Sequence, residues 1–197
     1  MNGKVGSFSR NEERARTAGH DPVILAGVMK VSNGVYPTGL LLTRNVSSEM
    51  IPLEIVADET VATGNGSTKN FTAIVLESFP VEPGTVSASD GVETFADDGS
   101  GRLSGSAGGS GTINYKTGKM TLSFNANVVN ATPVTAGYIT AINGVLDEET
   151  DTAQSGSGAY VAHGTVDSNV LKVGTVNPVA PSSVLMMLLQ SHGIYPV

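Results

Sequence analysis

Hydrophobic and polar residues alternate most regularly in the middle of the chain, between residues 113 and 124. Ile113–Tyr115 and Met120–Phe124 both place apolar side chains at every second position, which is typical of strands with one buried face. Between them, Lys116–Lys119 includes Gly118, a residue that tolerates a positive φ in a tight connection. The pattern predicts an antiparallel hairpin.

Apolar stretches on either side of this hairpin predict further strands of the same unit. They lie at Phe71–Leu76, Val86–Phe95 and Val134–Ile142. Polar, turn-rich sequence from about Asp58 marks the start of the unit. We therefore predict an inserted antiparallel β-sandwich-like domain over residues 58–141, with its two ends close together so that a host fold tolerates the insertion.

The segments that flank this insert predict a smaller β domain, formed by residues 21–57 and 142–197. In the first segment, the turn sequence Ser32–Gly34 separates two apolar stretches and predicts two strands joined as a hairpin. The run Leu40–Leu42 interrupts strict alternation and indicates a strand that is buried on both faces. Pro52 restricts the following segment to an edge strand or a crossing segment.

A short helix is predicted near the C-terminus. Ser182 and Ser183 are candidate capping residues, Pro181 suits a first helical turn, and Gly193 is placed to end the helix. Apolar side chains extend nearly around this helix, so it is either a buried core element or one that completes a subunit interface. The interface interpretation assigns the contact to Leu185, Met186, Leu189, Ile194 and Tyr195.

Two glycine- and serine-rich stretches, residues 99–111 and 154–158, predict mobile connections, because such sequence buries too little apolar surface to offset its ordering entropy. The acidic runs Asp147–Asp151 and Asp97–Gly99 lack the alternating oxygen ligands and the glycine spacing of a calcium loop. We therefore expect both acidic runs to be solvated turns.

Composition supports a mainly β protein. The chain has 197 residues, of which 24 are glycine, 40% are hydrophobic and 15% are charged, and this balance is typical of short strands joined by many turns. With no cysteine, neither a disulfide nor a thiolate metal site is expected. The first residues lack the apolar region of a signal peptide, and the apolar run Val184–Leu189 is far shorter than the roughly 20 residues that cross a bilayer. We expect synthesis in a cytoplasm and no membrane partner.

Charge divides the chain into a basic arm and an acidic body. Residues 1–20 hold four basic and two acidic side chains, whereas the rest of the chain holds 7 basic and 16 acidic ones. The acidic body argues against a nucleic-acid partner, because phosphate binding depends on clustered Lys and Arg. The arm is too polar to have a place in a core. It is either a solvated tail or, with Val5 and Phe8 as apolar anchors, a segment that orders on a partner.

Candidate catalytic groups are few. His20, His163 and His192 lie on different segments, and the chain contains no Gly-x-Ser-x-Gly elbow, phosphate loop or dinucleotide fingerprint. Scattered histidines without cysteine do not predict a transition-metal site, and we expect His163 to be a strand residue hydrogen-bonded near a turn. We therefore predict no enzyme activity, with no catalytic, metal-binding or cofactor-binding residue.

Two stretches together carry a resemblance to a known family. Val23–Arg44 runs V-I-L-A-G-V-M-K-V-S-N-G-V-Y-P-T-G-L-L-L-T-R, and Ala159–Val197 begins A-Y-V-A-H-G-T-V-D-S-N-V-L-K-V-G and ends S-H-G-I-Y-P-V. This pairing resembles the lambda-type head-decoration proteins of tailed bacteriophages, which bind the outside of a mature capsid. The middle unit is similar to small β-sandwich modules found in phage structural proteins.

The resemblance implies a function in assembly. It implies a virion protein on the outer surface of the capsid, made in the bacterial cytoplasm, that binds the major capsid protein and stabilises the shell against internal pressure. It also implies a homo-oligomer, with a trimer favoured over a dimer. The N-terminal arm, residues 1–20, would lie along the capsid, with Val5, Phe8, Arg10, Arg14 and Arg16 as its contact residues.

The alternative is a phage appendage or adhesion protein whose inserted β domain binds a host-surface glycan. A sugar-binding surface needs exposed aromatic rings on which the sugar can stack. Alternation instead assigns most of the aromatic residues in and near the insert to a core: Phe71, Phe95, Tyr115, Phe124 and Tyr138.

Overall fold

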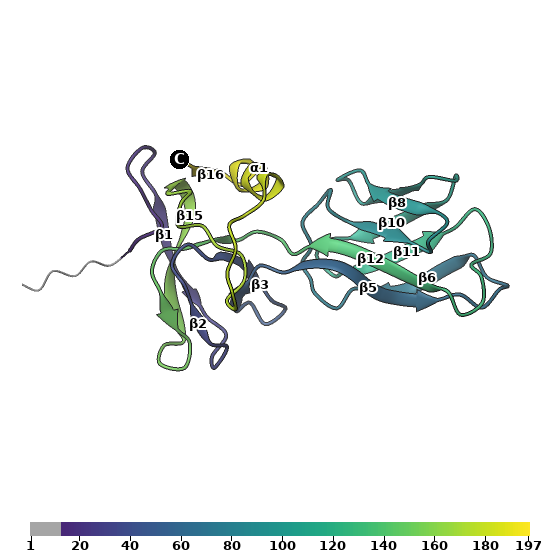
Figure 1. The fold of residues 1–197 in the computed structure, drawn as a ribbon, viewed down its shortest axis with the longest axis horizontal. Helices are drawn as coiled ribbons and strands as arrows, with labels where there is room; N and C mark the ends of the chain where they lie inside the picture. The colour runs from purple at the N-terminus through teal and green to yellow at the C-terminus, as the bar shows by residue number, and fades with distance from the viewer. Residues whose placement is uncertain (1–12) are drawn as a thin grey trace, which may run out of the picture.

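The computed structural model of the protein describes residues 13–197 (Figure 1). Strands make up 45% and helix 5% of the structure. The predicted fold class, mainly β with one short C-terminal helix, is confirmed.

One sheet of six strands, together with a ribbon of two, forms what we call the base domain. The strand order is β1-β15-β13-β3-β4, and β16 pairs in parallel with β15. The ribbon consists of β2 and β14. The bounds are β1 (Val23–Val28), β2 (Val35–Tyr36), β3 (Leu41–Arg44), β4 (Met50–Pro52), β13 (Gly144–Leu146), β14 (Thr150–Asp151), β15 (Ser157–Val166) and β16 (Ile194–Pro196).

A second large sheet has eight antiparallel strands in the order β5-β12-β7-β8-β9-β10-β11-β6, and we call it the eight-stranded unit. The bounds are β5 (Ile55–Thr63), β6 (Asn70–Val75), β7 (Ser87–Ser89), β8 (Thr94–Asp97), β9 (Arg102–Gly105), β10 (Ser110–Asn114), β11 (Lys119–Ser123) and β12 (Pro133–Ile139). The sheet is nearly closed. It forms one end of an elongated molecule, joined to the base domain through the chain that enters β5 and leaves β12 (Figure 1).

The ends of the eight-stranded unit lie side by side, since Ile55 at the start of β5 pairs with Ile139 at the end of β12. Adjacent ends are what an insertion into a host fold requires. The unit starts at Ile55 rather than at Asp58, because Ile55–Thr63 forms one continuous strand.

Alternation along the strands accounts for the core of the eight-stranded unit. Strand β12 buries every second residue, and β11 buries Met120 and Leu122 in the same way. The hairpin predicted around Gly118 is confirmed, with β10 paired to β11 and Gly118 at a φ of 64°. The rings of Phe95 and Phe124 meet edge to face at a centroid distance of 4.9 Å in the middle of this core.

The base domain has apolar clusters on both faces of its sheet. Leu41 packs into a cluster with the C-terminal helix, whereas Leu40 and Leu42 pack into a second cluster with Met29 and Tyr36. The prediction that the triple leucine is buried on both faces is confirmed. Pro52 is the last residue of β4, which lies at the edge of this sheet, and the segment after Pro52 crosses to the other large sheet and forms β5.

The predicted pairing of the first two strands is wrong. The turn itself forms, with positive φ at Ser32 and Gly34, but β1 pairs with β15 and β2 pairs with β14. After β1, Met29 donates its backbone N–H to Gly156 at 2.9 Å, so the chain keeps following its distant partner. The ten residues of β15 offer β1 a far longer ladder than the two residues of β2 do.

The prediction of a mobile loop over residues 99–111 is also wrong, because this stretch contains β9 and the start of β10. The buried carboxylate of Glu93 accepts backbone hydrogen bonds from Gly109 at 2.7 Å, Ala107 at 3.2 Å and Asn125 at 2.8 Å. A Cβ atom on Gly105 would lie 2.1 Å from the Glu93 Oε1 atom. Glycine is needed here for close packing around a buried acid. In the other predicted mobile stretch, 154–158, the last two residues belong to β15.

The C-terminal helix α1 (Ser183–Ser191) has the predicted cap and the predicted end, but Pro181 lies before the N-cap rather than in the first helical turn. Ser182 is the N-cap, and its hydroxyl oxygen accepts a hydrogen bond from the backbone N–H of Leu185 at 3.3 Å. His192 is the C-cap, and Gly193 follows it at a φ of 76°, which is the left-handed conformation that commonly ends a helix.

Candidate functional site

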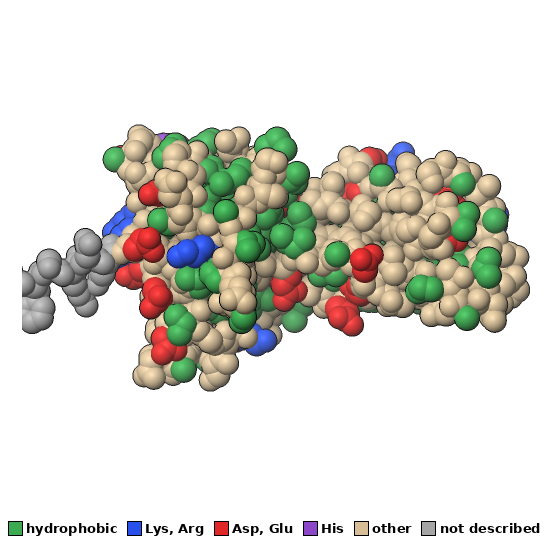
Figure 2. Space-filling model, viewed as in Figure 1, with side chains coloured by type: hydrophobic (Ala, Val, Ile, Leu, Met, Phe, Trp, Pro, Cys, Tyr) green, Lys and Arg blue, Asp and Glu red, His purple; other side chains and the backbone are tan. Residues whose placement is uncertain are grey.

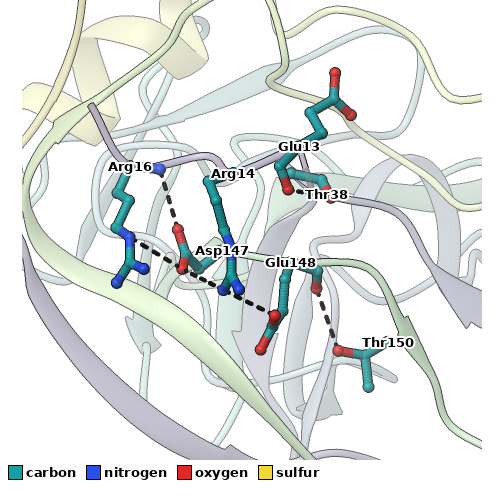
Figure 3. Close-up of polar contacts among 7 residues, drawn as sticks. All are labelled: Glu13, Arg14, Arg16, Thr38, Asp147, Glu148 and Thr150. Atoms are coloured by element: carbon teal, nitrogen blue, oxygen red, sulfur yellow. Dashed lines mark hydrogen bonds and ion pairs between the residues drawn. The ribbon is translucent and has the colours of Figure 1, made fainter. Parts of the chain in front are cut away.

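A buried carboxylate, that of Asp147, fastens the N-terminal segment to the base domain (Figure 3). The Asp147 side chain is 1% exposed. Its Oδ1 accepts a hydrogen bond from the Arg16 backbone N–H at 3.1 Å, and its Oδ2 lies 3.3 Å from Arg14 Nη1 and 3.5 Å from Arg16 Nε. Arg14 also pairs with Glu148 at 2.8 Å. We call Arg14, Arg16 and Asp147 the anchor.

Extended backbone explains how two arginines reach one acid. Residues i and i+2 of an extended segment point to the same side, so Arg14 and Arg16 face Asp147 while Ala15 faces the core. Ala15 is fully buried. Its N–H donates to the Asp147 carbonyl at 2.9 Å, and its own carbonyl accepts from the Asp167 N–H at 2.9 Å.

These contacts correct the predicted arm of residues 1–20. From Glu13 onward the segment belongs to the base domain, and a further hydrogen bond from Thr17 N–H to the Thr165 carbonyl, at 3.1 Å, extends it along β15. The expectation that the arm has no place in a core is wrong at Ala15. The prediction failed because it assumed that polar residues stay in solvent, whereas the two arginines beside Ala15 form ion pairs with a buried acid.

The anchor also corrects the expected solvated turn at Asp147–Asp151. Asp147 and Thr150 are buried, whereas Glu149 and Asp151 are exposed. A carboxylate removed from water needs opposite charge and hydrogen bonds in return, and here two guanidinium groups and one backbone N–H supply them. The buried acid therefore fixes residues 14–16 to the base domain.

Of the five predicted capsid-contact residues, Val5, Phe8 and Arg10 lie outside the described residues. Arg14 and Arg16 are both engaged in the anchor. Their guanidinium groups face Asp147, so their first role is to hold residues 14–16 on the base domain.

The predicted subunit-interface residues divide into two groups. Leu185, Leu189 and Ile194 are at most 1% exposed and pack in the core of the base domain, so their assignment to an interface is wrong: one face of the helix already covers the sheet. Met186 is half-buried, and Tyr195 is 39% exposed.

An exposed apolar surface that the prediction missed lies beside those residues. Figure 2 shows hydrophobic side chains gathered over α1 and the chain that leads into it. The most exposed side chains of this surface are those of Val176, Val179, Val184 and Met187, at 50 to 85% exposure. We call these four residues the C-terminal apolar patch. The sequence contains a signal for it, since no charged residue occurs between residues 173 and 191.

The three histidines are less scattered than the sequence indicates. The rings of His20 and His163 meet edge to face at a centroid distance of 4.8 Å. The centroid of the Tyr195 ring lies 5.9 Å from that of His20 and 6.0 Å from that of His163. His192 lies 2.8 Å from the buried carboxylate of Glu82. Among residues 13–197, no three His, Cys, Asp or Glu side chains are grouped to hold a metal ion.

Comparison with known proteins adds no further assignment. The chain matches no protein-family model, no curated protein and no solved structure. In the described part of the chain, no helix is long and apolar enough to span a membrane.

Proposed function

We propose that this protein decorates the outer surface of a phage capsid and stabilises the shell against internal pressure. One observation carries the proposal: the anchor and the hydrogen bonds of Ala15 hold residues 14–16 to the base domain, and this segment lies at the end of the base domain that is away from the eight-stranded unit (Figure 1). A docking contact at that end would leave the eight-stranded unit free to project away from the surface.

The segment before the anchor has the chemistry for such a contact. Its sequence includes Val5, Phe8 and Arg10, two apolar side chains and one cation that we propose bind the major capsid protein. The anchor fixes the end of this segment that joins the base domain. Fixing that end reduces the conformational entropy that the segment loses on docking. An arginine contact with an acidic capsid surface would weaken as salt increases.

Self-association would serve the same function. The chain carries a net charge of −7, so copies repel one another over most of their surface. The C-terminal apolar patch belongs to the uncharged stretch 173–191, where two copies can approach without that repulsion. We therefore propose a homo-oligomer, with a trimer favoured over a dimer, whose contact includes Val184 and Met187 rather than the buried Leu185 and Leu189.

Binding to the assembled lattice, but not to its dissociated subunits, stabilises the lattice by linkage. The gain at each site is RT ln(1 + [L]/Kd), which is about 2.7 kcal/mol when the free protein is at a hundredfold excess over Kd. Over the many sites of one shell, a modest affinity becomes a large resistance to rupture. This function needs neither a cofactor nor turnover.

The alternative, a glycan-binding surface on the eight-stranded unit, has weaker support. The five rings that the sequence analysis considered for stacking on a sugar are not free to do so. Phe95, Phe124 and Tyr138 are at most 2% exposed, and Phe71 and Tyr115 are half-buried.

The test compares capsids without the protein, capsids with the full chain added back, and capsids with a variant lacking residues 2–12. This deletion stops short of the anchor, so the variant should fold. We expect the full chain to raise the temperature at which heads rupture and the truncated variant neither to bind nor to raise it. Equal rupture temperatures with and without the full chain would refute the proposed stabilisation, and undiminished binding of the variant would remove the N-terminal segment from the docking mechanism.

A further inference from the structure

The junction between the base domain and the eight-stranded unit concentrates buried polar atoms that have no partner. Within residues 13–197, four buried side-chain atoms lack a hydrogen bond: Thr43 Oγ1, Arg44 Nε, Thr117 Oγ1 and Asn143 Oδ1. A buried polar atom without a partner costs stability, and each such atom needs an explanation. These four are far apart in the sequence, yet they belong to segments that meet at one place.

That place is hollow. A cavity of about 340 Å³ is lined by Arg44 and Asn143 from the base domain and by Phe79, Pro80 and Lys116 from the eight-stranded unit. A second cavity of about 110 Å³ shares Arg44 and Phe79 with it and is also lined by Thr43. Thr117 directly follows Lys116. All four unpartnered atoms therefore lie on, or next to, residues that line these two cavities, which together we call the junction cavity.

The larger part of the junction cavity is lined by positively charged side chains, although the protein as a whole is acidic. Arg44 and Lys116 both line it, and none of its lining residues is acidic. Within the described chain, neither cation takes part in an ion pair. Glu54 and Glu77 line only the smaller part, so the anionic end of a ligand belongs in the larger part.

The rest of the lining narrows the class of ligand. Among the lining residues, Arg44 offers donors and the Asn143 amide offers both a donor and an acceptor, so a ligand that has acceptor and donor groups suits this lining. Phe79 and Pro80 supply an apolar wall, which suits the C–H face of a sugar ring better than it suits an inorganic anion. A volume of about 340 Å³ is at the lower end of small-molecule sites.

From these features we propose that the junction cavity binds a hydroxylated carboxylate of monosaccharide size, such as a uronic or sialic acid. Arg44 and Lys116 bind the carboxylate, and Asn143 and Thr43 bind hydroxyl groups. Because the site uses residues of both structural units, its occupant would also fix one unit against the other. This inference is independent of the proposed capsid decoration, since it does not involve the N-terminal segment.

Calorimetric titration of the full chain tests the proposal. The ligands are glucuronate, galacturonate and N-acetylneuraminate, with glucose as a neutral control and inorganic phosphate as an anion control. We expect saturable binding of at least one acidic sugar, at least tenfold tighter than glucose or phosphate. Arg44→Met and Lys116→Met should each weaken this binding at least tenfold, whereas Lys69→Met, which removes an exposed lysine elsewhere on the eight-stranded unit, should not change it.

Thr43→Val separates a binding role from a structural one. The Thr43 hydroxyl has no partner in the structure, so the isosteric change should leave the Tm of the ligand-free protein the same or raise it, while binding weakens. No binding of any acidic sugar, equal binding to the Arg44→Met and Lys116→Met variants, or equal affinity for inorganic phosphate would each overturn the proposal. Lys116 is exposed, so its variant remains decisive if Arg44→Met does not fold.

Discussion

The two units of this protein build their sheets from contacts of very different range. In the eight-stranded unit, β7 to β11 follow one another both in the chain and in the sheet. In the base domain, β1 pairs with β15 and β3 with β13, so residues such as Val23 and His163 become neighbours across the whole insert. Local pairing costs less loop-closure entropy than distant pairing does.

This difference shows where each unit depends on particular side chains. The eight-stranded unit relies on a buried acid, Glu93, to organise a turn within one stretch of chain. The base domain relies on Asp147 to bring in a segment from far away, because Arg14 is 133 residues from its partner. A change at either acid should therefore affect one unit and spare the other.

The largest effect should come from Asp147→Ala. The change leaves two arginines without their buried partner and removes the acceptor of the Arg16 N–H. We expect the free energy of unfolding of the base domain to fall by about 2 to 4 kcal/mol. This loss is smaller than that for breaking a fully buried ion pair, because the Arg16 side chain is 44% exposed. Chemical denaturation would measure the loss of stability, and hydrogen exchange detected by mass spectrometry would show which unit is destabilised.

The matched control for this change is Glu149→Ala, an exposed acid two residues away, which should leave stability nearly unchanged. If hydrogen exchange sped up equally in both units of the Asp147 variant, the two units would be unfolding together, and the comparison between them would fail.

Glu93→Ala should have the next largest effect, on the other unit. It leaves the backbone N–H groups of Ala107, Gly109 and Asn125 without their acceptor, and we expect a loss of about 2 to 3 kcal/mol. Exchange should accelerate over residues 93–125 and not in the base domain. Asp58→Ala, an exposed acid of the same unit, is the control. Unchanged exchange in the Glu93 variant would contradict its role in ordering the glycine-rich turn.

A smaller effect should appear at high pH. Burial, with help from the hydrogen bond to Asp97, raises the pKa of Tyr115 to about 12. The pKa of Tyr115 in the folded protein is above its unfolded value of about 10. The stability that the neutral phenol contributes is therefore fully present below pH 10 and is lost between about pH 10 and 12. Tyr115→Phe should remove this part of the alkaline decline in Tm, and an identical decline in the variant would contradict it.

Sequence reasoning was most successful where one pattern dictates one structure. The alternation in β10 and β11 predicted a hairpin, the triple leucine predicted a strand buried on both faces, and Ser182 and Gly193 marked the ends of the helix. It failed where a distant partner decides the outcome. Nothing local to Arg14, Ala15 and Asp147 indicates that they meet, and nothing local to the glycine-rich stretch indicates that Glu93 lies beneath it.

The same limit applies to the candidate sites. The uncharged stretch 173–191 was visible in the sequence, but which of its apolar residues are exposed depends on which face of α1 covers the sheet. The junction cavity was not visible at all, because Arg44, Lys116 and Asn143 come from three separate segments that only the fold brings together.

Electron cryo-microscopy of capsids carrying the full chain tests the central claim most directly. If the N-terminal segment holds the protein to the shell, the map will show the base domain against the capsid, the anchor at its capsid-facing end, and the eight-stranded unit projecting outward. A map in which the eight-stranded unit lies on the shell, or in which no copies are bound, would contradict the proposed function.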